Sequence, residues 1–155
     1  MDYRLIGKKD WIQFVIFINW KKIATIGNTR YDENTNSAEL DNLAKHLDNK
    51  YPGFLNIVEK VHLKWMFDVF QLAKIIEKLF SDNYKALNPH FKCGFKITDV
   101  IPTKRKFVND GWIWQNISLD FDKESGEKYY HIVELSKKNL MKNFGNIKFQ
   151  ILKNE

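Results

Sequence analysis

The sequence predicts an α+β domain: an antiparallel sheet of about five to six strands, two main helices packed on one face of it, and a short C-terminal helix. Three observations favour this class. Alternating apolar runs typical of strands occur towards both ends of the chain, two longer segments carry apolar residues at helical spacing, and strands and helices do not alternate regularly. With 155 residues and 44% hydrophobic residues, we expect one globular domain over residues 1–155.

The first predicted element is a β-hairpin over residues 11–26. Apolar residues crowd positions 14–18, a polar turn follows at Asn19, and a second apolar run at 23–26 stops at Gly27-Asn28. The polar stretch that follows, as far as Asn36, is expected to form a surface loop.

Helical spacing governs the middle of the sequence. A helix is predicted to begin at Asn36 or Ser37 and to end at Tyr51-Pro52-Gly53. Its stripe consists of apolar residues spaced i, i+3, i+4 and i+7, namely Leu40, Leu43, Ala44 and Leu47. A short strand over 61–65 is expected next, although a neighbouring helix could extend through it, and a second helix covers 69–80.

The second half reads mainly as strands. The first predicted elements are a turn at Asn88-Pro89, a strand over 91–98, a basic loop over 102–111 and a strand over 112–122. A hairpin loop over 122–127 and a strand over 129–135 are expected next. A short helix capped by Ser136 and closed by Gly145 follows, and then a last strand over 147–151.

Charge and composition restrict the class of protein. The net charge is +6, of which residues 1–83 contribute 12 minus 11 and residues 84–155 contribute 13 minus 8. Such an uneven distribution favours an acidic partner. Because no apolar run approaches 18 residues, we expect no membrane partner and a cytoplasmic location. A single cysteine, Cys93, excludes an internal disulfide and a cysteine-rich zinc site, and its apolar neighbours favour a buried thiol.

No catalytic, cofactor or metal residue is predicted. The sequence lacks phosphate-binding glycine loops and the nucleophile elbow. The four histidines, His46, His62, His90 and His131, are not spaced as metal-binding pairs.

An acidic alternative site lies at the end of the strand predicted over 112–122. Asp120 and Asp122 share one face of that strand and, with His131, could bind a divalent metal for a phosphodiesterase or nuclease. The chain contains no Glu-x-Lys, which nucleases of this kind carry, so ordinary solvated carboxylates are the simpler interpretation.

Two tryptophans lie on the polar face of the same strand. Trp112 and Trp114 follow directly after Lys104-Arg105-Lys106, so aromatic area and positive charge meet at one end of the sheet. Such a patch could anchor a protein partner or stack the bases of single-stranded nucleic acid. Alternatively, a helix covers this face and both tryptophans belong to the core. We predict Lys104, Arg105, Lys106, Trp112 and Trp114 as partner-binding residues.

The N-terminal third resembles small bacterial toxin-immunity proteins, including those of contact-dependent growth inhibition and polymorphic toxin systems. The resemblance rests on Trp11-x-x-Phe14 with Phe17-Ile18-Asn19, on Ile26-Gly27, and on the leucines at 40, 43 and 47. It implies a small, non-catalytic α+β domain that binds one toxin.

These observations lead to three functional hypotheses. The first is a non-catalytic inhibitor of a protein partner, either an immunity protein that neutralises a toxin or a phage anti-defence protein. The second is a single-stranded nucleic-acid-binding protein that uses the same basic, tryptophan-bearing face. The third is a metal-dependent phosphodiesterase or nuclease around Asp120 and Asp122.

Overall fold

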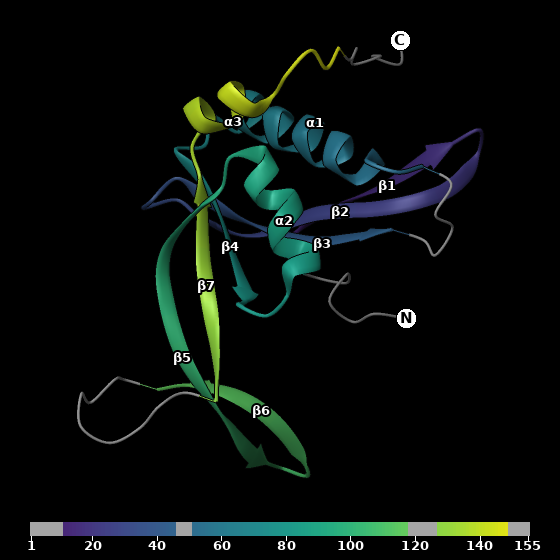
Figure 1. Ribbon diagram of the computed structural model, residues 1–155. Helices are drawn as coiled ribbons and strands as arrows, with labels where there is room; N and C mark the ends of the chain where they lie inside the picture. The colour runs from purple at the N-terminus through teal and green to yellow at the C-terminus, as the bar shows by residue number, and fades with distance from the viewer. Residues whose placement is uncertain (1–10, 46–50, 118–126, 149–155) are drawn as a thin grey trace.

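The computed structural model describes residues 11–45, 51–117 and 127–148 (Figure 1). These residues form seven strands: β1 (Ile12–Ile18), β2 (Lys21–Asp32), β3 (Ser37–Lys45), β4 (Lys74–Phe80), β5 (Lys96–Val108), β6 (Gly111–Asn116) and β7 (Lys128–Leu135). They also form three helices: α1 (Phe54–Val69), α2 (Tyr84–Cys93) and α3 (Lys137–Asn143). No helix in this part of the chain is both long and apolar enough to cross a lipid bilayer.

The strands form one mixed sheet in the order β1-β2-β3-β4-β7-β5-β6. All neighbouring pairs are antiparallel except β3 and β4, which are parallel and joined through α1. The predicted α+β class is therefore confirmed. The purely antiparallel sheet of five to six strands is wrong, because a strand, helix and strand in succession make a parallel crossover in the centre.

Both long helices predicted from apolar spacing are strands. The helix predicted from residue 36 is β3, in which Ala38 and Leu40 alternate towards the core. The helix predicted over 69–80 is β4, where Ile75, Glu77 and Leu79 share the core-facing side by alternation. Because Glu77 occupies one of the core-facing positions of β4, the alternation of apolar residues is interrupted. The spacing of the remaining apolar residues then resembles that of a helix.

Two predicted strands give way to helices. Residues 61–65 lie inside α1, whose inner side buries Leu63, Met66 and Phe67. The strand predicted over 91–98 is divided between the end of α2 and the start of β5. The turn predicted at Pro89 is also wrong, because this proline lies inside α2, whose start is capped by Asn83 accepting a hydrogen bond from the Ala86 N–H.

Strict alternation and turn residues gave correct predictions elsewhere. The N-terminal hairpin is confirmed as β1 and β2, although β2 continues beyond Gly27 to Asp32. The strand over 129–135 is β7, and Ser136 caps α3 by accepting a hydrogen bond from the Asn139 N–H. The segment 102–111 is no loop: it contains the end of β5 and a tight turn into β6. Most of the strand predicted over 147–151 lies outside the described residues.

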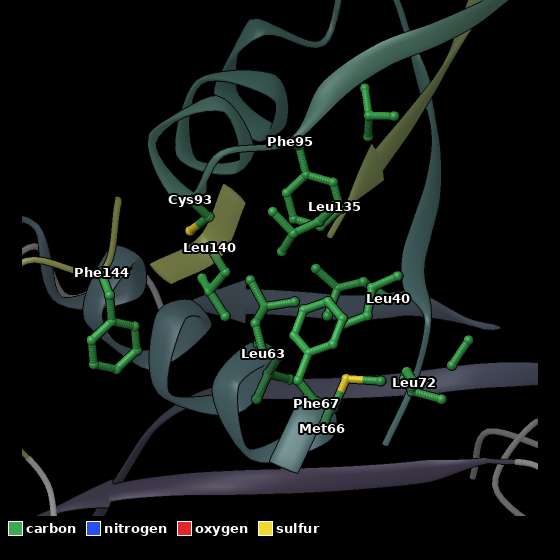
Figure 2. Packing of buried hydrophobic residues seen from close by; sticks show 14 of the residues in the cluster. Leu40, Leu63, Met66, Phe67, Leu72, Cys93, Phe95, Leu135, Leu140 and Phe144 are labelled. Atoms are coloured by element: carbon green, nitrogen blue, oxygen red, sulfur yellow. The ribbon is translucent and has the colours of Figure 1, made fainter. Parts of the chain in front are cut away.

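The three helices pack on one face of the sheet and share one hydrophobic core with it (Figure 2). Leu63 and Phe67 of α1 meet Leu40 of β3, while Leu135 of β7 and Leu140 of α3 close the other side. Cys93 is buried in this core, as predicted. The opposite face carries no helix among the described residues. It is called the helix-free face below.

We expect Gly94→Ala to destabilise the fold. Gly94 ends α2 at a φ of 103°, and a Cβ there would come within 2.7 Å of the Asn139 carbonyl oxygen of α3. Backbone cannot yield as a flexible side chain does, so we expect a loss of about 2 to 4 kcal/mol in the free energy of unfolding. Urea denaturation measures it. Gly145→Ala is the matched control, because Gly145 also has a positive φ, 70°, but has open space around the Cβ position. Equal losses in the two variants would contradict the clash.

Candidate functional site

The parallel strands β3 and β4 are paired over only a short length. The pairing of β3 with β4 extends over only three residue pairs, from Ser37–Lys74 to Glu39–Ile76. Beyond that point the two strands diverge beside α2 (Figure 1). A pocket of about 340 Å³ lies at this divergence, lined by residues of β3, α1, β4 and α2: Leu43, Leu55, Glu77, Leu79, Asn83, Lys85, Ala86, Pro89 and His90.

A buried histidine between two carboxylates lies at this pocket. Nδ1 of His90 is 2.5 Å from Oε1 of Glu59 in α1, and its Nε2 is 2.9 Å from Oε2 of Glu77 in β4. The side chains of His90 and Glu59 are 1% and 0% exposed, whereas that of Glu77 is 14% exposed and lines the pocket. Glu77 is therefore the member of the group that a ligand can reach.

The pKa values of the group follow from burial and from the charges around it. Burial raises the pKa of Glu77, and the contact with His90 offsets only part of this effect. Burial alone would lower the pKa of His90, but Glu59 and Glu77 raise it to about 10. His90 is therefore an imidazolium at neutral pH, and Glu77 is a stronger base than an exposed glutamate.

The N-terminus of α1 opens on the same pocket through Leu55. Gly53 precedes the helix with a φ of 77°, and no side chain caps it. No acidic residue lies in the first turn. The N–H groups of Phe54 and Asn56 donate within the turn, to the carbonyls of Tyr51 and Gly53, so the attraction of this terminus for an anion rests on the helix dipole.

Cys93 does not supply a nucleophile here. The thiol is fully buried beneath the pocket, and burial raises its pKa, with the charge of Glu59 adding to the effect. A protonated thiol without solvent access reacts slowly. The chemistry of the site therefore rests on its carboxylates and histidine.

The five residues predicted to bind a partner lie on the β5–β6 hairpin, which extends away from the helices (Figure 1). The guanidinium of Arg105 is 5.6 Å from the ring centroid of Trp112 and 6.0 Å from that of Trp114, so these three side chains do converge. Lys104 and Lys106 alternate onto the other face.

Neither tryptophan is a core residue under a helix. Trp112 is 66% exposed, whereas Trp114 is half-buried against Phe80, with ring centroids 5.5 Å apart. None of the five residues lines the pocket at the strand divergence. Their role in binding a partner stays a prediction.

The residues proposed for a metal site are not brought together in the described part of the chain. Asp120 and Asp122 lie outside the described residues, and His131 lies in β7. Within the described ranges, no group of three histidine, cysteine or acidic residues is arranged to bind a metal ion.

Sequence reasoning missed the three residues of the buried group. One signal existed for Glu59: it falls on the apolar side of α1 with Leu63 and Met66, where a carboxylate needs a partner. His90 and Glu77 gave no comparable signal, because their elements were assigned wrongly.

Comparison with known proteins bears on fold alone. No family model and no curated protein sequence matches the chain. Among solved structures, a spermidine N-acetyltransferase from Vibrio cholerae in complex with CoA and spermine matches with a TM-score of 0.64 at 16% identity, over 86% of this chain and 69% of that one. The dodecameric structure of spermidine N-acetyltransferase from the same organism in an intermediate state gives a TM-score of 0.62 at 16% identity, over 89% and 69%.

This match corrects the functional hypotheses. The chain has the fold of spermidine N-acetyltransferases, so the resemblance to toxin-immunity proteins is wrong. The inhibitor function inferred from that resemblance loses its support. The nucleic-acid-binding and phosphodiesterase alternatives do not fit this fold either.

Two histidines should give opposite pH dependence of stability. Because the folded pKa of His90 is raised to about 10, its stabilising contribution is complete below pH 6.5 and is lost as pH rises towards 10. Burial lowers the pKa of His62 to about 4, so its contribution is present above pH 6.5 and is lost as pH falls towards 4. We expect His90→Gln to cost about 3 to 5 kcal/mol at pH 7, because it leaves buried carboxylates without their cation.

Urea denaturation from pH 4 to 10 measures both contributions. The loss caused by His90→Gln should shrink as pH rises, whereas His62→Gln should leave the alkaline slope of the original chain intact. If both variants kept the same alkaline slope, His90 would not carry the charge assigned to it.

Proposed function

We propose that this chain is an acyltransferase that moves an acyl group from a coenzyme A thioester to an amine. The observation that carries the proposal is the pocket between the diverging strands β3 and β4, which is lined both by Glu77 and by Leu55 at the uncapped start of α1. The fold shared with spermidine N-acetyltransferases supports the same reaction, because one of those enzymes is seen with CoA and spermine.

The donor would enter at the N-terminus of α1. Coenzyme A carries phosphates joined to a long, narrow arm that ends in sulfur. The positive end of the helix dipole after Gly53 suits the phosphates, and the pocket lined by Leu43, Leu55 and Leu79 suits the arm. The thioester would then lie towards Glu77.

The reaction requires a base more than a nucleophile. A protonated amine must lose its proton before its nitrogen attacks the thioester carbon. A C–N bond then forms, the C–S bond breaks, and the departing thiolate takes up a proton. The raised pKa of Glu77 suits it to accept the ammonium proton as general base. His90 and Glu59 are positioning residues, since both are buried behind Glu77.

Spermidine is the first acceptor to test, because the matched enzymes act on it. In this proposal the ligands are small molecules, and the cytoplasmic location predicted from the sequence is kept, since thioester donors are made there. The acyl thioester of coenzyme A is consumed as a substrate, and free coenzyme A is released as a product.

Glu77→Gln should abolish most of the turnover while leaving donor binding intact. Loss of a general base typically costs about 10² to 10⁴ in rate. We would follow the release of free thiol from acetyl-CoA with spermidine as acceptor, and acetyl-CoA affinity by calorimetry. The original chain should show an alkaline rise in kcat/KM that Glu77→Gln lacks.

The matched control is Glu134→Gln. Glu134 is also a partly buried glutamate of the central sheet, but it points to the helix-free face and pairs with Lys74 at 3.0 Å. This variant should retain turnover. Failure of the original chain to bind acetyl-CoA, or equal activity in both variants, would refute the proposal.

A charge placed at the start of α1 should separate donor binding from stability. A Cβ at Gly53 would meet nothing within 4 Å, and aspartate tolerates the left-handed backbone found there. Gly53→Asp and Gly53→Asn share the backbone strain of a side chain at this φ, but the aspartate should repel the phosphates and lower acetyl-CoA affinity about tenfold relative to Gly53→Asn. Calorimetry and thermal unfolding measure the two effects. Equal affinity in the two variants would place the phosphates elsewhere.

A further inference from the structure

The outer edge of β1 is unusually bare. β1 is the first strand of the sheet, and no strand among the described residues pairs with its outer side. From Trp11 to Trp20 the sequence contains neither a charged residue nor a proline. Exposed edges normally carry lysine, proline or a covering segment, because their free N–H and C=O groups pair readily with another strand.

Apolar side chains are exposed on both faces of the sheet at this edge. Val15 and Phe17 are 45% and 58% exposed on the helix-free face. On the other face, Phe14 contacts Trp65 of α1 at 5.0 Å between ring centroids, and Trp65 contacts Phe70 at 5.1 Å. We call the whole surface the β1 edge patch, and its exposed residues are Ile12, Phe14, Val15, Phe17, Val69 and Phe70.

Charge indicates which partner suits this patch. The chain carries a net charge of +6, so most of its surface repels a second copy. β1 itself contains no charged residue from Ile12 to Ile18, so two copies can approach along this strand without charge repulsion. The opposite edge of the sheet differs, because the β5–β6 hairpin carries Lys104, Arg105 and Lys106.

We propose that a second copy of this chain pairs with the outer edge of β1 in antiparallel orientation, around a two-fold axis at Val15. This arrangement places Val15 opposite the partner's Val15 and Phe14 opposite the partner's Ile16. Both positions lie where β1 is in regular register with β2, which extends from Ile12 to Ile16. The sheet then continues through both copies.

The two-fold arrangement uses the same patch on both copies, as a two-fold interface requires. Phe70 lies near Ile12, which this register places opposite the partner's Ile18, so Val69 and Phe70 extend the apolar surface at each end of the paired strands. Strand pairing satisfies the backbone groups of the edge, and the apolar side chains of β1 supply the apolar contact.

The association state tests the proposal without any assay of acyl transfer. Light scattering after size exclusion, over a range of concentrations, should give a dimer for the original chain. Val15→Lys sets two lysines opposite each other at the axis and should give a monomer with unchanged circular dichroism. Val100→Lys is the matched control, because Val100 is a strand valine with 46% exposure against 45% for Val15. It should remain dimeric.

A cross-link tests the register. In the Val15→Cys variant the two new thiols face each other across the axis, so mild oxidation should convert most of the protein into a disulfide-linked dimer. The Val100→Cys variant should not cross-link. Cys93 will not interfere, because it is fully buried. A monomeric original chain, a dimeric Val15→Lys variant, or a Val15→Cys dimer that resists cross-linking would each overturn the proposal.

Discussion

His90 holds together three elements that are far apart in the sequence. α2, which carries it, has ten residues and an internal proline, and a helix this short has little stability of its own. Its ring is held by Glu59 on α1 and by Glu77 on β4. The position of α2 beside the diverging strands, and hence the wall of the pocket, depends on this contact together with the apolar packing of Leu87 and Cys93.

Alternation bounded by turn residues gave correct predictions at some positions and misled at 61–65 and 91–98, which lie wholly or partly in helices. The correctly predicted elements are the N-terminal hairpin, β7 and α3. β3 and β4 could not be predicted, because their alternation is interrupted: in β3 by a register shift against β2 between Asp41 and Ala44, and in β4 by a carboxylate that faces the core. The crossover helix α1 then had no place in the predicted order, and the parallel pairing it creates was missed.

The candidate site could not be predicted for a related reason. Glu59, Glu77 and His90 form no motif along the chain, and only the parallel crossover brings them together. The sequence instead drew attention to Trp112 and Trp114, whose aromatic character is visible without a fold. The aromatic residues of the β5–β6 hairpin form a local sequence pattern and can be recognised without a fold. The buried polar group is assembled only by the chain topology and cannot.

The contact at Gly94 joins the site to the end of the chain. Here α2 terminates against the backbone of α3, with no room for even one additional carbon. Helices seated this closely leave little room for one to shift against the other, so α3 restricts the position of α2 and of the imidazole that α2 carries. A helix that contributes no residue to the pocket lining therefore helps to fix one wall of the pocket.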